Sequence, residues 1–321
     1  MNPADLGRKI RGAFGARSLG CWPTPLERAT ALAERTGARE LWVKREDRSA
    51  DAYGGNKVRG LEFLFSGVEA GDAVVTVGGC GSTHCLAAAR HARALGAHAV
   101  IAQFPQGASD TAAATERAVD RWATARYPAR TWAGFPLAWL RAWRHAGRLG
   151  PRRRVPGGGA APVAVLGHAL AVLELADQLP SGPEAVVTPL GSGGTAAGIL
   201  LGCELLGWRP AVYAARVAPR VVANRRRVER LREAARRLLR EHGVGWAESV
   251  GSPRLVIVDA MGRGYGQPTD AGERARGWAR EAGFETDSTY GGKALAAVPA
   301  VTAAGHGRLV YWHTYARPDG E

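Results

Sequence analysis

Short apolar, β-branched runs alternate along this chain with longer segments rich in Ala and Leu. The first set is an apolar run at 73–78, an Ala-rich segment at 82–96 and a second apolar run at 97–104. Ser82 is suited to cap a helix at its start, and Gly96 to end it. The pattern therefore predicts a strand, a helix and a parallel strand.

The same pattern returns in the second half of the chain. It predicts a strand at 185–189, a helix at 195–207 and a strand at 211–217. Further buried strands are predicted at 254–260 and 307–313. Strands that alternate with helices form mostly parallel sheets covered on both faces. We therefore predict an α/β fold, and 321 residues are enough for two domains.

The chain is strongly basic, but the distribution of its charge does not indicate a clear function. The net charge is +14, and the densest basic run is 224–243. Its apolar residues recur at helical spacing, with Glu between the Arg, so we interpret it as an amphipathic helix ended by Gly243. Those apolar residues are Val228, Leu231, Ala235 and Leu238. This interpretation is favoured over nucleic-acid binding, because no aromatic-interleaved or zinc motif accompanies the run.

Other segments mainly exclude classes of protein. The basic loop at 150–159 is interpreted as solvated, and 105–159 as mostly helical with unclear connections. The N-terminus has no apolar run for a secretory signal, and Pro189 and glycines interrupt the longest uncharged stretch. The four cysteines form no CxxC or metal-ligand spacing. We expect a cytoplasmic protein that binds no metal, nucleic acid or membrane.

Lysine is rare in this chain. Lys and Arg together number 43, but only Lys9, Lys44, Lys57 and Lys293 are lysines. An amine can lose its proton and form a Schiff base, whereas a guanidinium cannot. Lys57 follows two glycines and an asparagine in "GGNK". It is either a solvated lysine or one with a chemical role.

Two Gly-rich junctions between a strand and a helix offer anion sites. In "TPLGSGGTAAG", 188–198, backbone N–H groups and the hydroxyls of Ser192 and Thr195 suit one phosphate group, although a turn without a ligand is an equal alternative. In "VGGCGSTHCLAAA", 77–89, a carboxylate suits Ser82 and its neighbours Thr83 and His84. The alternatives here are a simple N-cap and a buried structural histidine. An amine, a phosphate site and a carboxylate site together match pyridoxal phosphate acting on an amino acid.

Seven sequence blocks carry a family resemblance. They begin with "PTPLERATALAERTG…LWVKREDRSADAYGGNKVRGLEFL" and continue through "VTVGGCGSTHCLAAA", "VPGGGAAPVAVLGHALAVLELADQLP", "TPLGSGGTAAG", "GRGYGQPT", "DSTYGGKALAAV" and "YWHT". In this order they resemble the aminocyclopropane-carboxylate deaminase and D-cysteine desulfhydrase family of pyridoxal phosphate enzymes, which is tryptophan synthase β-like (fold type II). The resemblance implies a homodimer. It also implies a large cofactor-binding domain, 1–59 and 167–321, and a small domain, 60–166.

The resemblance also implies roles for single residues. Lys57 would bind the cofactor covalently, and Asn56 would steady its loop. Ser82 would contact the substrate and move protons, and Thr83 and His84 would complete the carboxylate pocket, with Thr83 also near the cofactor. The phosphate would be held by Gly191, Ser192, Gly193, Gly194 and Thr195.

Three further residues would complete the cofactor site. Tyr290 corresponds to the tyrosine beside the cofactor ring and Tyr265 to a second active-site tyrosine. Thr314 is the candidate partner of the ring nitrogen. Core packing with one satisfied hydroxyl is the alternative for both tyrosines.

Four positions depart from the family pattern. Thr83 stands where Asn is usual, Gly291 where the deaminases have Glu, Gly60 where a second Lys is common, and Tyr315 where Gly is usual. Each change is expected to touch cofactor or substrate. The missing Glu at position 291 argues against opening of the aminocyclopropane ring.

The sequence therefore predicts a pyridoxal phosphate lyase that acts on a small amino acid. The predicted reaction is α,β-elimination, which releases ammonia and a 2-oxo acid. A β-replacement synthase is the alternative within the class. A non-catalytic cofactor binder and a polyanion-binding protein on the same scaffold are the alternatives outside it.

Overall fold

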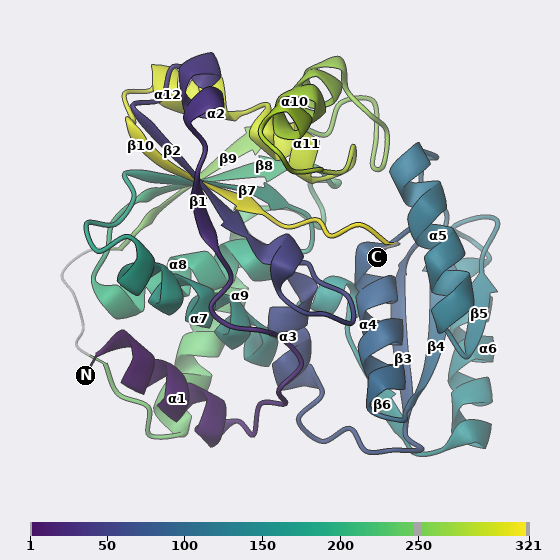
Figure 1. Ribbon diagram of the computed structural model, residues 1–321. Coiled ribbons are helices and arrows are strands. Elements are labelled where there is room, and N and C mark those ends of the chain that lie inside the picture. Colours follow the sequence, from purple (N-terminus) through teal and green to yellow (C-terminus); the bar gives the residue numbers. More distant parts are fainter. Residues whose placement is uncertain (1, 247–251, 319–321) are drawn as a thin grey trace.

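The computed structural model describes residues 2–246 and 252–318. The chain forms an α/β fold with two separate sheets that lie side by side in Figure 1. Within the described residues, all strand pairs are parallel except that of β1 with β2. The predicted α/β fold with mostly parallel sheets is confirmed.

The larger sheet has six strands and the smaller sheet has four. In spatial order, the larger sheet consists of β1 (Leu26–Arg28), β2 (Glu40–Arg45), β10 (Arg308–His313), β7 (Ala185–Leu190), β8 (Ala211–Arg216) and β9 (Arg254–Asp259). The smaller sheet consists of β5 (Ala125–Pro128), β4 (His98–Phe104), β3 (Ala73–Gly79) and β6 (Arg152–Arg154).

Helices cover both faces of the larger sheet. Successive strand residues face opposite sides, so Val186 packs into one core and Val187 into the other. The first face carries α1 (Pro3–Ala13), α7 (Pro162–Gln178), α8 (Gly194–Leu206) and α9 (Arg225–Glu241). The second carries α2 (Thr30–Thr36), α10 (Asp270–Glu281), α11 (Gly291–Leu295) and α12 (Val298–Ala303).

The smaller sheet is covered in the same way. One face packs against α3 (Lys57–Leu64), α4 (Thr83–Ala94) and α5 (Asp110–Trp122), and the other packs against α6 (Phe135–Leu149). Two short 3₁₀ turns, η1 (Glu46–Arg48) and η2 (Gly157–Gly159), complete the elements. No helix in the described part of the chain is both long and apolar enough to cross a lipid bilayer.

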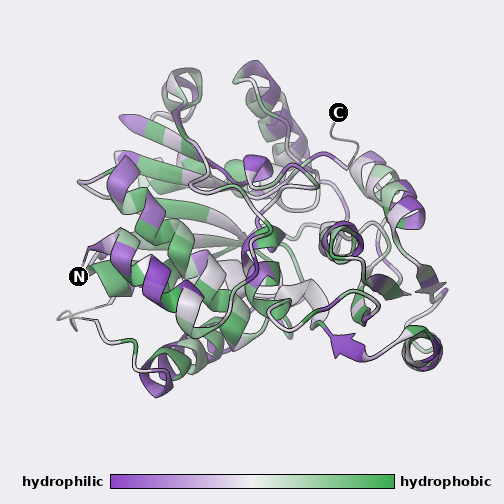
Figure 2. Ribbon diagram, turned by 60° about the horizontal axis from the view of Figure 1, so that its bottom comes forward, coloured by the Kyte–Doolittle hydropathy of each residue, from purple (hydrophilic) through white to green (hydrophobic). Residues whose placement is uncertain are grey.

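Most predicted elements are found in place, but the segment 105–159 is only partly helical. It contains the strands β5 and β6 besides α5 and α6. Both strands lie at edges of the smaller sheet, where one side needs no partner, and neither carries an apolar run. The three residues of β6 are exposed arginines, and this strand is uniformly hydrophilic in Figure 2.

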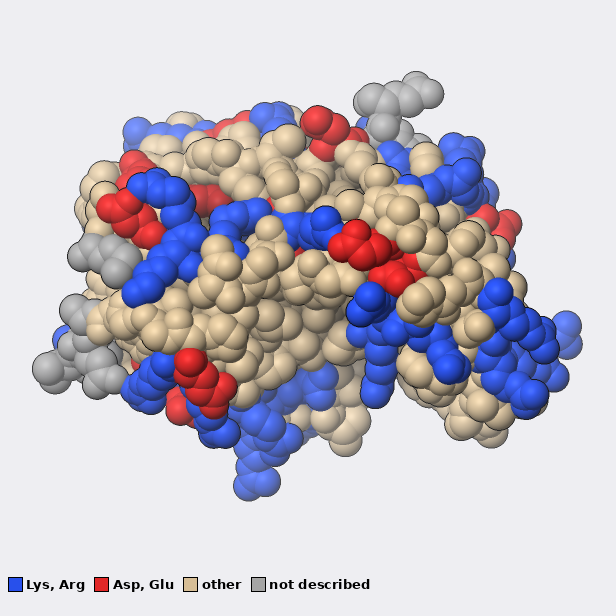
Figure 3. Space-filling view, turned by 90° about the horizontal axis from the view of Figure 1, so that it is seen from below, with Lys and Arg blue, Asp and Glu red and all other residues tan. Residues whose placement is uncertain are grey.

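The basic run forms α9, capped by the side chain of Asn224, so the predicted amphipathic helix is confirmed. One position of its buried face differs from the prediction. Leu239 is buried and Leu238 only half-buried, because the residue four positions after Ala235 lies beneath it on the helix face. Arginines occupy the outer face, and Figure 3 shows Lys and Arg in several groups over one side of the molecule, with fewer acidic residues between them.

The predicted domain limits remain a prediction. The limit at 59/60 falls within α3 and that at 166/167 within α7, so each helix would belong to both domains. The outer ends of the predicted ranges, residue 1 and residues 319–321, lie outside the described residues.

A buried ion cluster fixes α3 against α7 and the larger sheet. The Arg59 guanidinium donates Nε and Nη2 to Glu46, at 2.7 and 2.9 Å, and Nη1 and Nη2 to Glu174, at 2.7 and 2.8 Å. Lys44 Nζ lies 3.5 Å from Glu174. The Trp22 ring covers the guanidinium, with its centroid 3.9 Å away. Such bidentate pairs have a fixed geometry, so they set the position of α3.

We predict that Glu46→Gln lowers the free energy of unfolding by about 3 kcal/mol, because it leaves an uncompensated buried positive charge. Glu281→Gln is the matched control. It removes an exposed carboxylate paired with Arg35, and should cost less than about 1 kcal/mol. Urea unfolding followed by circular dichroism measures both. Equal losses in the two variants would show that the cluster does not fix the helix.

Candidate active site

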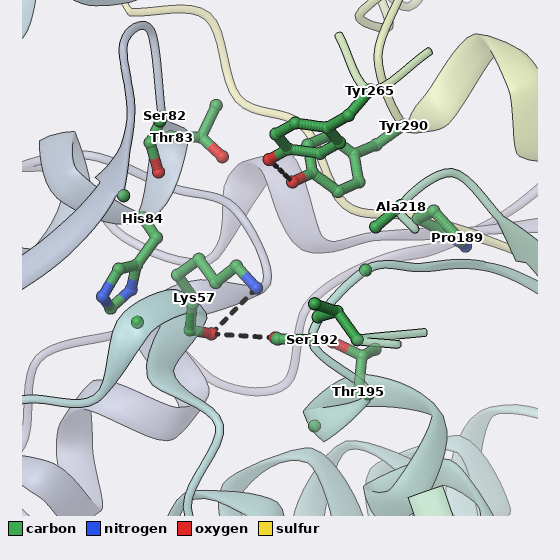
Figure 4. Close-up of a pocket in the computed structure, with 18 of the residues that line it drawn as sticks. Lys57, Ser82, Thr83, His84, Pro189, Ser192, Thr195, Ala218, Tyr265 and Tyr290 are labelled. Atoms are coloured by element: carbon green, nitrogen blue, oxygen red, sulfur yellow. Dashed lines mark hydrogen bonds between the residues drawn. The ribbon is translucent and has the colours of Figure 1, made fainter. Parts of the chain in front are cut away.

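A cavity of about 360 Å³ is lined by residues from both sheets, at the carboxyl ends of β3 and β7. In parallel sheets this end of the strands is the usual place for a ligand. All of the predicted site residues line it, and Figure 4 labels several of them, among them Lys57, Ser82 and Tyr290. The predicted site residues are Asn56, Lys57, Ser82, Thr83, His84, Gly191, Ser192, Gly193, Gly194, Thr195, Tyr265, Tyr290 and Thr314.

Lys57 is the first residue of α3, and its amine points into the cavity (Figure 4). Nζ donates to the carbonyl oxygen of Gly158 at 3.2 Å. No carboxylate among the described residues lies within ion-pair distance of it. Burial therefore lowers the pKa of the amine from 10.5 to about 8, since desolvation disfavours the charged form. Near neutral pH an appreciable fraction of this amine carries no charge.

Asn56 connects the lysine loop to the second Gly-rich junction. Its side-chain Nδ2 donates to Thr195 Oγ1 at 2.7 Å, and its backbone N donates to the Thr314 carbonyl at 3.2 Å. The predicted role of Asn56, to steady the loop, therefore has a concrete physical basis. The Thr195 hydroxyl accepts this bond, so its own proton is free for an anion.

The β7–α8 junction has the features of a phosphate site. Gly193 has φ +93°, in the left-handed region that favours glycine. It turns the chain so that α8 begins at Gly194 with amides that have no partner within the helix. Arg227 adds a positive charge nearby, and its Nε donates to the Ser192 carbonyl at 2.9 Å.

Glycine at position 191 leaves room for the side chain of Tyr290. A Cβ there would lie 2.9 Å from Cε1 of Tyr290, which has to approach the turn closely. Backbone amides, hydroxyls, a helix N-terminus and a guanidinium form a donor set that fits the phosphate of pyridoxal phosphate.

The β3–α4 junction forms the second anion site. Ser82 is the N-cap of α4, and its Oγ accepts from the backbone N of Cys85 at 3.4 Å, so the predicted cap is confirmed. A Cβ at Gly78 would lie 2.7 Å from Ser82 Oγ, which explains the glycine there. The amides of Thr83 and His84 open the helix without a partner in it. They suit the carboxylate of an amino acid.

The ring of His84 does not provide a positive charge for that carboxylate. Its Nε2 lies 2.9 Å from Thr76 Oγ1, and the Thr76 hydroxyl donates to the Val155 carbonyl at 3.0 Å. Nε2 therefore donates. Burial and the nearby charge of Lys57 lower the pKa of His84 to about 3. The interpretation as a structural histidine fits its ring, and only its backbone amide fits the anion site.

Tyr265 and Tyr290 form a hydrogen-bonded pair, with 2.5 Å between the two hydroxyl oxygens. Figure 4 shows both hydroxyls facing the cavity. Burial raises the pKa of Tyr265 to about 12 and that of Tyr290 well above its usual range, so both keep their protons. Each tyrosine lines the cavity, so packing alone does not account for them.

Sequence reasoning missed Asp287. Its carboxylate lines the cavity but accepts three backbone N–H groups, from Thr289 at 3.0 Å and from Tyr290 and Gly291 at 2.8 Å. Burial raises its pKa. Asp is a typical residue for such local backbone bonds, and its position three residues before Tyr290, the N-cap of α11, is the signal that identifies it. It holds the turn that presents Tyr290.

Sequence reasoning also misjudged the loop at 150–159. The prediction of a solvated basic loop holds for the exposed arginines of β6, but the glycines that follow belong to the cavity. The Gly158 carbonyl accepts from both Lys57 Nζ and Ser192 Oγ, at 3.2 and 3.4 Å. The loop therefore joins the two halves of the site.

Only two of the four departures from the family pattern lie at the cavity. Thr83 and Tyr315 line it. Gly60 instead packs against α7, where its Cβ would lie 3.1 Å from that of Ala164. A Cβ at Gly291 would lie 1.7 Å from Thr286 Oγ1, so a side chain there would meet Thr286 before the cavity. The expectation that each departure touches cofactor or substrate is therefore wrong for Gly60 and Gly291.

Comparisons with known proteins agree with this geometry. The family model described as "Pyridoxal-phosphate dependent enzyme" matches residues 17–314. Nocardicin C-9' epimerase from Nocardia uniformis subsp. tsuyamanensis is 34% identical, over 91% of this chain and 90% of the relative. D-cysteine desulfhydrase from Salmonella choleraesuis is 32% identical, over 85% of this chain and 84% of the relative.

Solved structures extend the likeness to the fold. A crystal structure of an ACC deaminase homologue superposes with a TM-score of 0.78 at 26% identity, covering 95% of this chain and 94% of the other. Threonine deaminase isoform 2 from Solanum lycopersicum has a TM-score of 0.65 at 18% identity, covering 98% and 85%, which shows the fold alone. The predicted fold type II, the predicted family resemblance and the predicted cofactor, pyridoxal phosphate, are confirmed. The chain belongs to the family of pyridoxal-phosphate dependent enzymes.

Proposed function

We propose that this enzyme removes the α-proton of an amino acid and eliminates a group from its β-carbon, releasing ammonia and a 2-oxo acid. One observation carries the proposal. The desolvated Lys57 amine lies in one cavity with a phosphate-type junction, a carboxylate-type junction and a pair of protonated tyrosines. The likeness to D-cysteine desulfhydrase supports the same reaction class.

The residues around the cavity would divide the work of holding cofactor and substrate. The α8 N-terminus and Thr195 would hold the phosphate, Lys57 would carry the cofactor, and Tyr290 would lie beside its ring. Thr314 would face the ring nitrogen with a neutral hydroxyl, which does little to raise that nitrogen's pKa. Bound pyridoxal phosphate supplies an electron sink that makes the α-proton of the amino acid acidic.

Proton movements fall to this chain's own side chains. The α-carboxylate would dock at the amides of Thr83 and His84, next to Ser82. The uncharged Lys57 amine would accept the α-proton, for which a pKa near 8 is suitable. The tyrosine pair, which keeps its protons, would donate one to the leaving group as its bond to the β-carbon breaks.

Epimerisation at the α-carbon is the second candidate. It is favoured by the 34% identity to nocardicin C-9' epimerase. It also fits the placement of Lys57 and the tyrosine pair, which reach into the cavity from different sides (Figure 4). In this reaction either Lys57 or the tyrosine pair would remove the α-proton, and the other of the two would return a proton to the opposite face of the α-carbon. The residue roles, a cytoplasmic location and a homodimer are also proposed. β-Replacement and cofactor binding without catalysis are the remaining alternative functions.

We predict that Lys57→Ala abolishes the visible absorbance of the purified protein while leaving it folded. Borohydride reduction of the wild-type protein should fix the cofactor on the peptide that contains Lys57, because this amine is the desolvated one in the cavity. Lys9→Ala is the control and should keep the band. A labelled peptide containing Lys9, Lys44 or Lys293 instead would refute the assignment.

We predict that Gly194→Asp lowers cofactor affinity at least about tenfold more than Gly194→Asn. The Asn and Asp side chains have the same shape and differ in charge. A Cβ at this position has room, with its nearest neighbour 3.8 Å away, so the difference reports charge. Repulsion of 1.4 kcal/mol from a phosphate already gives tenfold. Asp at a helix N-terminus does not weaken the helix. Titration of cofactor-free protein with pyridoxal phosphate measures both variants, and equal affinities would place the phosphate elsewhere.

We predict that D-cysteine and β-chloroalanine yield pyruvate and ammonia, whereas alanine, which has no leaving group, undergoes only exchange of its α-proton. The neutral Thr314 hydroxyl should also keep conversion of the cofactor to pyridoxamine phosphate slow. Incubation in D₂O followed by NMR and a pyruvate assay measures these products. Inversion of alanine without pyruvate from β-chloroalanine would instead select epimerisation.

A further inference from the structure

Three aromatic side chains form one wall of the cavity, at the end of β4 and the start of α6. They are Phe104, Trp132 and Phe135, and we call them the aromatic wall. Phe104 stacks on Trp132 with ring centroids 4.7 Å apart and meets Phe135 edge to face at 5.7 Å. These are favourable aromatic geometries, so the rings are held in place before any ligand arrives.

A second apolar surface lines the same cavity from the larger sheet. It consists of Ala218, Pro219 and Val222, which follow β8. Val222 is 38% exposed and Trp132 is 63% exposed. Neither side chain is needed to fill a core, and single exposed apolar residues are common. Their gathering at the cavity that contains Lys57 is what requires an explanation.

Three lining side chains, Lys57, Arg227 and Asp287, carry or can carry a charge near neutral pH. The Asp287 carboxylate is occupied by three backbone N–H groups. Arg227 bonds to the Ser192 carbonyl at the phosphate-type junction. Phe104, Trp132 and Phe135 themselves offer no charged group to pair with a charged substrate side chain.

We propose that the substrate is an amino acid with an aromatic or similarly large apolar side chain, which binds between the aromatic wall and Val222. This inference rests on the proposed function and replaces the expectation of a small amino acid. A cysteine side chain ends one atom beyond its β-carbon and leaves such a surface uncovered. Burying a phenyl group is worth about ten- to a hundredfold in affinity.

The test is calorimetric titration of the cofactor-loaded protein with racemic alanine and racemic phenylalanine. Racemic ligands are used because any interconversion of enantiomers then leaves the ligand unchanged. Wild-type protein should bind phenylalanine at least about tenfold more tightly than alanine. Trp132→Ala and Val222→Ala should each lower the affinity for phenylalanine several-fold and leave that for alanine unchanged.

Matched controls are the exposed residues Leu137, five positions after Trp132, and Val221, directly before Val222, and neither lines the cavity. Leu137→Ala and Val221→Ala should keep the preference for phenylalanine. Equal affinities in the wild type, or a preference that survives in both Trp132→Ala and Val222→Ala, would overturn the proposal. Equal loss for both ligands would also overturn it, since the two walls would then pack on each other and not on the substrate.

Failure of the proposed function is distinguishable from failure of this inference. If the protein bound no cofactor and showed no visible absorbance, the proposed function itself would be wrong. If it bound cofactor and both amino acids alike, only the substrate class would be wrong.

Discussion

Desolvation of the Lys57 amine is the constraint on which the site depends. An amine acts as a base or a nucleophile only without its proton, and burial away from carboxylates favours that form. Two buried or partly buried carboxylates of the fold, Glu46 and Glu174, are paired with other cations. Arg59 and Lys44 engage Glu46 and Glu174 in the ion cluster. Residues two apart on a helix do not share a face, so the ion cluster at Arg59 and the Lys57 amine lie on different faces of α3.

The same separation of charge organises the rest of the cavity. Two helix N-termini, those of α4 and α8, present backbone amides from the two different sheets. The Asp287 carboxylate at the cavity accepts three backbone N–H groups of the turn that follows it. Asn56 and the Gly158 carbonyl tie the amine to the phosphate-type junction. Positive potential from fixed groups thus surrounds an amine whose pKa burial lowers to about 8, which suits an anionic cofactor and an anionic substrate.

The strands and both Gly-rich junctions are predictable from the sequence because their signals are local. Apolar β-branched runs mark β3, β4, β7 and β8, and a cap residue such as Ser82 marks the start of a helix. The family resemblance supplied Tyr265 and Tyr290, which are distant from Lys57 in the chain. The structure adds that they bond to each other.

Features that depend on long-range packing were not predictable from the sequence. The edge strands β5 and β6 exist because β3 and β4 offer them partners, and their own residues carry no strand pattern. Nothing local marks the Gly158 carbonyl as the partner of an amine a hundred residues earlier in the chain. The sequence likewise does not show that the aromatic wall lies at the cavity that contains Lys57, because only the fold brings these residues together.

The pH dependence of cofactor attachment reports whether burial lowers the pKa of the Lys57 amine. The rate constant for binding of pyridoxal phosphate to cofactor-free protein is measured by stopped-flow absorbance from pH 6.5 to 10.5. This rate constant should rise with its midpoint near pH 8 and then reach a plateau, because burial lowers the pKa of the Lys57 amine to about 8. A rate that continues to rise toward pH 10.5, as for a lysine exposed to water, would contradict it.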